Sequence, residues 1–241
     1  MENEPDLNKK LFFLLHENAD LDEIKDLIEA GADVNAKNDY GETPLHFAKT
    51  EDIVKFFFSC GACVNAEDDC GYTPLHNAYT RRKDIGIKRL LIEGGANVNL
   101  RDWYGDTFLH LAKTEEETKL LLEHGADVNA KAQNNITPLH KAKTIGQMKL
   151  LLEHGADINA QDDYGRTNLH WVSTEEKIKL LLDYGADTNI RDMDNDKPYL
   201  HFLYIFQPIL KFLGLEEDDE EDEDGDTYKY EKQFYQKILN S

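Results

Sequence analysis

Histidines and cysteines are the residues of this 241-residue chain whose types and spacing could support metal or redox chemistry. Zinc is held by imidazole and thiolate ligands about 2.0–2.3 Å away, and a Cys-x-x-Cys pair is typical of zinc sites and of redox centres. Cys60 and Cys63 form such a pair, and Cys70 follows it. Six histidines recur at intervals of 30 to 34 residues: His46, His76, His110, His140, His170 and His201. Whether these side chains meet depends on the elements that position them.

The recurring histidines belong to a repeated unit of sequence. One marker, Gly-Ala-x-x-Asn, begins at Gly31, Gly61, Gly95, Gly125, Gly155 and Gly185. A second marker, Thr-x-Leu-His, begins at Thr43, Thr73, Thr107, Thr137 and Thr167, and a degenerate copy occupies residues 197–201. Two markers that stay in register over so many copies predict a repeat architecture, in which each unit packs on its neighbours.

Each unit has the signals of a turn followed by two helices. Pro44 suits the first position of a short helix, where its missing N–H costs nothing. A second helix carries the apolar residues of segment 53–57 and ends at the left-handed cap Gly61. The turn before Thr43 contains Gly41, in a slot that favours positive φ. Asn replaces this glycine in two copies and is the side chain that tolerates such backbone best.

These motifs resemble those of the ankyrin repeat family over about residues 7–215. The resemblance implies an all-α ankyrin-repeat solenoid of about six to seven repeats including both caps, each with a β-turn and two antiparallel helices. Most copies lack three of the usual 33 residues, and the loss lies between the helices. Thr114 with Glu117, and Thr144 with Gln147, predict capping boxes that begin the second helix directly.

The markers also predict where each repeat begins and ends. We expect an N-terminal capping repeat at 7–37, then repeats at 38–67, 68–101, 102–131, 132–161 and 162–191, a degenerate C-terminal capping repeat at 192–215, an acidic disordered linker at 216–226 and an amphipathic helix at 227–241. The final helix has apolar residues at helical spacing, and we expect it either to fold back over the apolar 199–215 segment or to fray.

The architecture argues against shared metal ligands. Stacked helices lie about 8–10 Å apart, so successive histidines cannot reach one zinc ion. The family resemblance instead makes these histidines hydrogen-bonding residues that tie the turn to the helix. Cys60 ends a helix, and no second cysteine pair accompanies it. We therefore expect no catalysis, no cofactor and no metal, and we retain a Cys-based metal or redox protein as an alternative.

The residues that vary within the repeat frame are the candidates for binding. In ankyrin proteins the turn tips and inner helices line a concave surface where partners bind, and Tyr and Trp are enriched at binding hot spots. The candidate partner-binding residues are Tyr40, Glu42, Asp69, Tyr72, Trp103, Tyr104, Asp106, Gln133, Asn134, Ile136, Asp163, Tyr164 and Arg166. The alternative for the tyrosines is packing on the neighbouring turn. Trp171, on an inner helix, is expected in the core.

Net charge limits the partner class. The chain has 27 Lys and Arg against 48 Asp and Glu, a formal net charge of −21. Nucleic-acid binding is disfavoured, because phosphate affinity comes from Lys and Arg. We expect a monomer that binds a protein with basic and apolar surface. An inhibitor or nucleic-acid mimic that uses the acidic segment 216–226 is the second alternative.

The remaining signals concern location. No run of about 20 apolar residues predicts a membrane span, no signal peptide opens the chain, and three cysteines do not make a disulfide framework. These features favour a cytoplasmic protein. The abbreviated repeats resemble those in ankyrin proteins of bacteria that live inside eukaryotic cells. That resemblance implies a bacterial effector, exported to a host cytosol without a cleaved signal peptide.

Overall fold

The computed structural model describes residues 6–17, 19–81 and 84–195, and the chain divides into two compact units, residues 1–127 (unit 1) and 128–241 (unit 2). Within the described ranges the regular elements are α-helices and one 3₁₀ turn, and an isolated β-bridge pairs Arg101 with Thr107. The predicted all-α fold is confirmed. The expected cap beyond residue 195, the acidic segment and the final helix lie outside the described residues.

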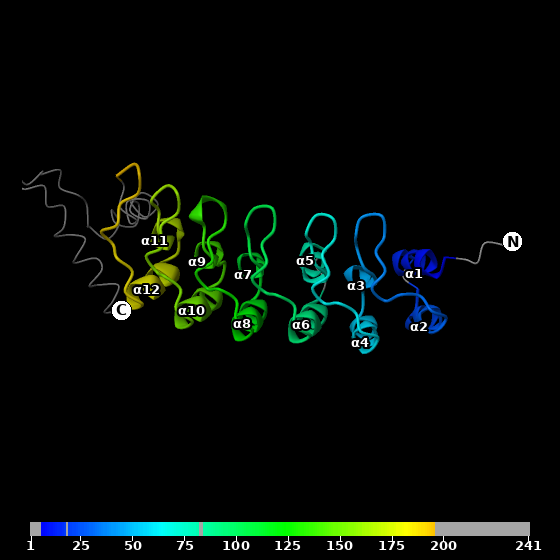
Figure 1. Ribbon diagram of the computed structural model, residues 1–241. Helices are drawn as coiled ribbons and strands as arrows, with labels where there is room; N and C mark the ends of the chain where they lie inside the picture. The colour runs from blue at the N-terminus through cyan, green and yellow to red at the C-terminus, as the bar shows by residue number, and fades with distance from the viewer. Residues whose placement is uncertain (1–5, 18, 82–83, 196–241) are drawn as a thin grey trace, which may run out of the picture. The chain divides into compact units, whose positions relative to one another are not determined.

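Unit 1 is built from helix pairs that stack side by side (Figure 1). Its helices are α1 (Leu7–His16), α2 (Leu21–Glu29), α3 (Pro44–Phe47), α4 (Glu51–Ser59), α5 (Pro74–Thr80), α6 (Ile85–Glu93), α7 (Phe108–Leu111) and α8 (Glu115–Glu123). In one layer α1 contacts α3, α3 contacts α5, and α5 contacts α7. In a second layer α4 contacts α6, and α6 contacts α8. The hairpin loops that connect the pairs project from the layer of odd-numbered helices. This layer is called the inner layer below.

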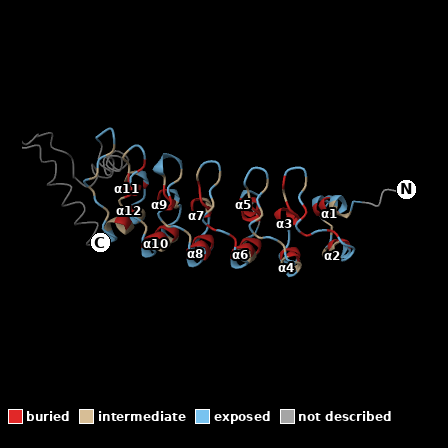
Figure 2. Cartoon of the chain, in the orientation of Figure 1, coloured by how far each residue is buried: buried red, intermediate tan, exposed pale blue. Residues whose placement is uncertain are grey.

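Unit 2 repeats this arrangement over its described residues. Its elements are η1 (Gln133–Asn135), α9 (Pro138–Lys141), α10 (Ile145–Glu153), α11 (Asn168–Trp171) and α12 (Glu175–Asp183). The inner helices α9 and α11 contact each other, as do the outer helices α10 and α12. In Figure 2 the buried residues lie on the helices, whereas the hairpin loops are largely exposed. None of the helices in the described ranges of either unit is long and apolar enough to cross a membrane.

The inner helices are short because a capping residue stands at each end. Thr43 precedes Pro44 and forms a capping box with His46, three positions later in the first turn. Thr50 then caps α4 by accepting the Ile53 N–H at 3.3 Å, so the next helix begins almost at once. The same arrangement recurs around α7 and α9, where Thr114 and Thr144 cap the next helix. The helix α11 also has four residues and a Thr167–His170 capping box, but Thr174 makes no side-chain cap bond to α12.

One repeat in unit 1 is longer, and its extra residues lie between its two helices. The inner helix α5 has seven residues where α3 and α7 have four. The outer helix α6 begins after Asp84, whose carboxylate accepts the Ile87 N–H at 3.0 Å. The spacing of the sequence markers predicts this location, because the repeat with a 34-residue spacing differs from the 30-residue repeats between its two helices.

Of the two predicted outer capping boxes, one forms as expected and the other lacks its reciprocal bond. Thr144 and Gln147 cap α10 reciprocally, as predicted. The Thr114 hydroxyl accepts the Glu117 N–H at 3.1 Å, but the Glu117 carboxylate accepts the Lys113 N–H at 2.6 Å and forms a buried ion pair with Lys88 of α6. Glu117 therefore connects two repeats instead of serving only as a local cap.

The hairpin loops have conformations that depend on one polar side chain. The Asn38 side-chain oxygen accepts the N–H groups of Tyr40 and Glu42 at 2.9 and 3.0 Å, and Gly41 takes φ +74°. Asp replaces Asn38 at the equivalent positions of the other hairpins except in the fourth, where Ala132 has no such acceptor. There both Asn134 and Asn135 adopt positive φ, one more left-handed residue than the sequence predicted.

A ladder of asparagines joins successive repeats within each unit. The Asn35 amide donates to the Gly61 carbonyl at 3.1 Å, and its oxygen accepts the Cys63 N–H at 2.8 Å. Asn99 makes the same two bonds to the next repeat, at 3.0 and 2.8 Å. Asn65 and Asn129 act likewise. Each asparagine thus uses both ends of its amide, so the marker Gly-Ala-x-x-Asn encodes the helix stop and the bond to the neighbour.

Candidate functional site

The hairpin tips of unit 1 present large aromatic side chains to solvent. Tyr40 and Trp103 are each 73% exposed, and Tyr104 is 69% exposed. Their backbones are fixed: Asn38 holds the first tip, and Asp102 accepts the Tyr104 N–H at 2.9 Å in the third. The Asp69 N–H donates to the Tyr40 carbonyl at 3.0 Å, which places an exposed carboxylate beside the first tip. An ordered backbone therefore carries aromatic and acidic side chains outward.

Three other candidates in unit 1 are buried or half-buried. Glu42 is half-buried and pairs with Arg81 at 3.4 Å. Tyr72 is half-buried, with its ring 5.1 Å from that of His76 in the same repeat. Asp106 is only 7% exposed. The accessible part of the candidate set in unit 1 is thus Tyr40, Asp69, Trp103 and Tyr104.

In unit 2 the candidates divide in the same way. Gln133, Asn134, Asp163 and Tyr164 are exposed, and Ile136 and Arg166 are half-buried. The Asp163 N–H donates to the Asn134 carbonyl at 3.0 Å, so these two hairpin tips lie side by side. Asp163 also accepts a hydrogen bond from the Asn135 amide, which ties its carboxylate to the neighbouring loop.

The expectation that Trp171 lies in the core is wrong. Trp171 is 45% exposed, while Leu169 and Val172 on either side of it are buried. Phe47, which ends the inner helix α3 at the equivalent position, is by contrast buried. The Trp171 ring lies 5.9 Å from the His140 ring of the preceding inner helix. Sequence reasoning missed this exposed aromatic, because a helix of one turn offers no period from which its buried face can be recognised.

The recurring histidines that the structure describes act as the resemblance implies, and His201 lies outside the described residues. The Thr43 N–H donates to Nδ1 of His46 at 3.0 Å, and the Thr43 hydroxyl lies 2.9 Å from the same nitrogen. Because Nδ1 accepts, Nε2 carries the proton and donates to the Tyr72 carbonyl at 3.1 Å. His140 repeats the arrangement with Thr137 and the Arg166 carbonyl. These rings tie a helix to its own turn and to the next hairpin.

Burial keeps these rings neutral. Desolvation lowers the pKa of His46 below its ordinary value of 6.5, although the hydrogen bond to Tyr72 and the nearby acids oppose it. Burial lowers the pKa values of His76 and His140 in the same way. His76 differs in one respect: its Nε2 has no hydrogen-bond partner in the described structure, and its ring packs 4.7 Å from the Phe108 ring.

The cysteines are not brought together as a site. Cys60, Cys63 and Cys70 are free thiols, the first half-buried at the end of α4 and the other two exposed. Among the described residues, no group of three or more His, Cys, Asp or Glu side chains could hold a metal ion.

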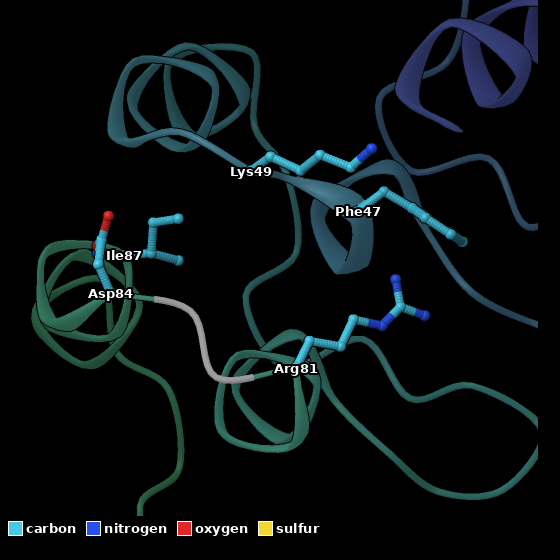
Figure 3. Close-up of a pocket in the computed structure, with 5 residues that line it drawn as sticks. All are labelled: Phe47, Lys49, Arg81, Asp84 and Ile87. Carbon is cyan, nitrogen blue, oxygen red and sulfur yellow. The ribbon is translucent and has the colours of Figure 1, made fainter. Parts of the chain in front are cut away.

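A cavity of about 280 Å³ opens in unit 1 beside α3, α5 and α6 (Figure 3). It is lined by Phe47, Lys49, Arg81, Asp84 and Ile87. Its polar side chains hold the helices together: Arg81 lies 5.3 Å from the centre of the Phe47 ring, Lys49 donates to the His16 carbonyl at 3.1 Å, and Asp84 caps α6. The lining is thus explained by structural contacts.

Comparisons with known proteins agree with this architecture. The family model for ankyrin repeats in three copies matches residues 11–102, 49–132 and 113–192. Among solved structures 475 chains match, and one is the crystal structure of the ankyrin repeat domain of Bcl-3, described as a unique member of the IkappaB protein family. That match has 28% sequence identity and a TM-score of 0.65, and it covers 82% of this chain and 93% of the other. No curated protein sequence matches the chain.

Proposed function

The chain belongs to the ankyrin repeat family, whose repeats are generally protein–protein interaction modules on a scaffold that is typically not enzymatic, and from this premise we propose that it binds a partner protein through its hairpin tips. The observation that carries the proposal is the exposure of Tyr40, Trp103 and Tyr104 on fixed loops of unit 1. Rigid aromatic side chains supply large contact area and lose little conformational entropy on binding.

The excess of acidic residues in unit 1 supports a partner with a basic surface. Residues 1–127 contain 26 Asp and Glu against 14 Lys and Arg, and Asp39 and Asp69 stand at the aromatic tips. A partner surface with basic and apolar groups complements these tips, because opposite charges guide encounter and apolar groups cover the rings. We propose such a surface as the partner's chemistry, with this chain acting as a monomer.

Affinity capture followed by mass spectrometry tests the proposal. The full chain is compared with the Trp103→Ala/Tyr104→Ala variant and with Tyr184→Ala, which removes a half-exposed aromatic ring at the end of the outer helix α12. We expect a partner that carries a basic surface, is lost with the double variant, is kept by Tyr184→Ala and is weakened by salt. A partner that the double variant retains would contradict the proposed site.

The source of the captured partner tests the cellular role. We propose that the protein acts as a bacterial effector in a host cell, on the basis of its abbreviated repeats. The capture is therefore run in lysates from a eukaryotic cell and from a bacterium. A tip-dependent partner found in the bacterial lysate alone would contradict the effector role and would leave the binding function intact.

A further inference from the structure

Unit 2 carries an exposed cluster of one guanidinium and two aromatic rings. The Arg166 guanidinium carbon lies 4.7 Å from the centre of the Tyr164 ring and 4.8 Å from the centre of the Trp171 ring. Tyr164 and Trp171 are 54% and 45% exposed, respectively. Tyr164 comes from the hairpin and Trp171 from the inner helix α11, so the cluster spans the hairpin and the inner layer of one repeat.

A buried carboxylate fixes the orientation of this guanidinium. Asp162, whose side chain is fully buried, accepts from Nε of Arg166 at 2.9 Å and lies 2.9 Å from its Nη2. The other Asp162 oxygen accepts the Tyr164 and Arg166 backbone N–H groups, each at 2.9 Å. Burial alone would raise the pKa of Asp162, but the backbone N–H and the side chain of Arg166 outweigh it and hold the pKa below its ordinary value.

The guanidinium retains donors for a ligand. A guanidinium has five N–H groups, and Asp162 engages one on Nε and one on Nη2. The other three have no acceptor among the residues that the structure describes. Two N–H groups that remain on Nη1 and Nη2 have the parallel geometry that binds both oxygens of a carboxylate. The arginine is thus held in place with its second edge open.

The surroundings differ in charge from those of the tips in unit 1. Residues 128–195 contain 10 Asp and Glu against 8 Lys and Arg, close to balance. Lys141 is exposed at the end of α9, the inner helix that contacts α11. Among the acids nearby, Asp163 is bonded to the Asn135 amide, and the next hairpin, which contacts Tyr164 and Gly165, carries Asp192 and the exposed Asp194. At the cluster itself an incoming carboxylate meets the Arg166 guanidinium, whereas an incoming cation would compete with Arg166 for the two rings.

We propose that Tyr164, Arg166 and Trp171 form a docking site for an acidic peptide segment, in which a carboxylate binds Arg166 and an adjacent aromatic or aliphatic side chain packs on Trp171. This inference goes beyond the proposed function, because it assigns to unit 2 a ligand of opposite charge from the one that unit 1 binds.

Tryptophan fluorescence of the full chain tests the proposal directly. The Trp103→Phe background leaves Trp171 as the single tryptophan. The probe is the acetylated and amidated heptapeptide Gly-Glu-Asp-Phe-Asp-Glu-Gly, and its matched control is Gly-Gln-Asn-Phe-Asn-Gln-Gly, which has the same shape without charge. A third peptide carries lysines in place of the four acids. We expect the acidic peptide to shift Trp171 emission to shorter wavelength and to bind at least about tenfold more tightly than the amide peptide.

Variants assign the binding to Arg166. In Arg166→Gln we expect the preference for the acidic peptide to disappear, and in Arg166→Lys to fall, because lysine keeps the charge but loses the planar fork. Lys149→Gln on the outer helix α10 makes the same change in net charge and should leave binding unchanged. Thermal unfolding followed by circular dichroism establishes that each variant is folded.

The outcomes separate this inference from the proposed function. Equal binding of the acidic and amide peptides by the Arg166-containing protein would overturn it, whatever the variants do. Tighter binding of the lysine peptide would overturn it as well, and would assign the rings to a cationic ligand. The Trp103→Ala/Tyr104→Ala variant, which tests the tips in unit 1, should respond to the acidic peptide as the native chain does.

Discussion

Because its histidines are buried, we expect this protein to lose stability on acidification at a higher pH than the one at which its carboxylates titrate. Protonation of Nδ1 would place an N–H against the Thr43 N–H that now donates to His46, so the folded protein favours the neutral ring. The pKa of His46, His76 and His140 is accordingly lowered from 6.5. The unfolded chain takes up these protons as the pH falls below about 6.5, and the folded chain takes them up only at lower pH. Stability is therefore present above that pH and is lost below it.

The size of the effect follows from the number of protons. Each proton that the unfolded chain binds and the folded chain does not contributes about 1.4 kcal/mol per pH unit to the slope of the unfolding free energy. The three histidines whose pKa is lowered therefore give a limiting slope of about 4 kcal/mol per pH unit. Because a domain has only about 5–15 kcal/mol of stability, this loss would be large.

Urea unfolding of the full chain between about pH 7.5 and 5.5 measures this slope. His46→Gln retains an acceptor for the Thr43 N–H, as in a Thr/Gln capping box, but cannot be protonated. We expect its slope to be smaller than that of the native chain, by up to about 1.4 kcal/mol per pH unit. His124→Gln is the control, because the exposed His124 ring donates from Nδ1 to the Leu120 carbonyl and is not a buried acceptor of a backbone N–H. Identical slopes for His46→Gln and the native chain would refute the reasoning.

Three further perturbations follow from the packing and are each measured by urea or thermal unfolding. Lys88→Met leaves the Glu117 carboxylate buried without its cation and should lower the free energy of unfolding by about 3–5 kcal/mol. Lys88→Met/Glu117→Leu should restore most of that loss, and an equally unstable double variant would contradict this account. Asn99→Ala removes two bonds to the next repeat and should cost about 1–3 kcal/mol, and an unchanged midpoint would show that the ladder adds no stability. In Gly61→Ala the new Cβ meets open space, so the variant should lose only the strain of positive φ, about 1–2 kcal/mol. In Gly41→Ala the new Cβ would also lie 2.8 Å from the Asp69 backbone nitrogen, so the loss of stability should be larger. Equal losses would argue against this clash.

The repeat architecture could be predicted because its signals are local. Thr43, Pro44 and His46 form one capping unit within four residues, and Gly61 ends the next helix in the conformation that its marker predicts. Each of these residues interacts chiefly with its own turn, so sequence spacing alone carries the information. The same reasoning located the extra residues of the long repeat.

The features that escaped prediction depend on contacts between repeats. Glu117 has the spacing of a local cap, but its carboxylate pairs with Lys88, which lies 29 residues away. Trp171 ends a helix of a single turn, in which the buried face cannot be recognised from period alone. Asp106 occupies the same slot as Glu42, yet it is 7% exposed and Glu42 is half-buried. The tip residues have the most predictable positions, since their own loop determines them.

The asparagine ladder has a consequence for how the chain folds as it is synthesised. Within each unit its hydrogen bonds join residues only 26 to 32 positions apart. A repeat that leaves the ribosome therefore has its complete binding surface for the next repeat within about one further repeat length of translation. Loops of this length close quickly, and contacts of short sequence separation favour rapid folding. Helix pairs can consequently stack one after another from the N-terminus, and each newly made pair spends little time with its apolar face exposed to other nascent chains.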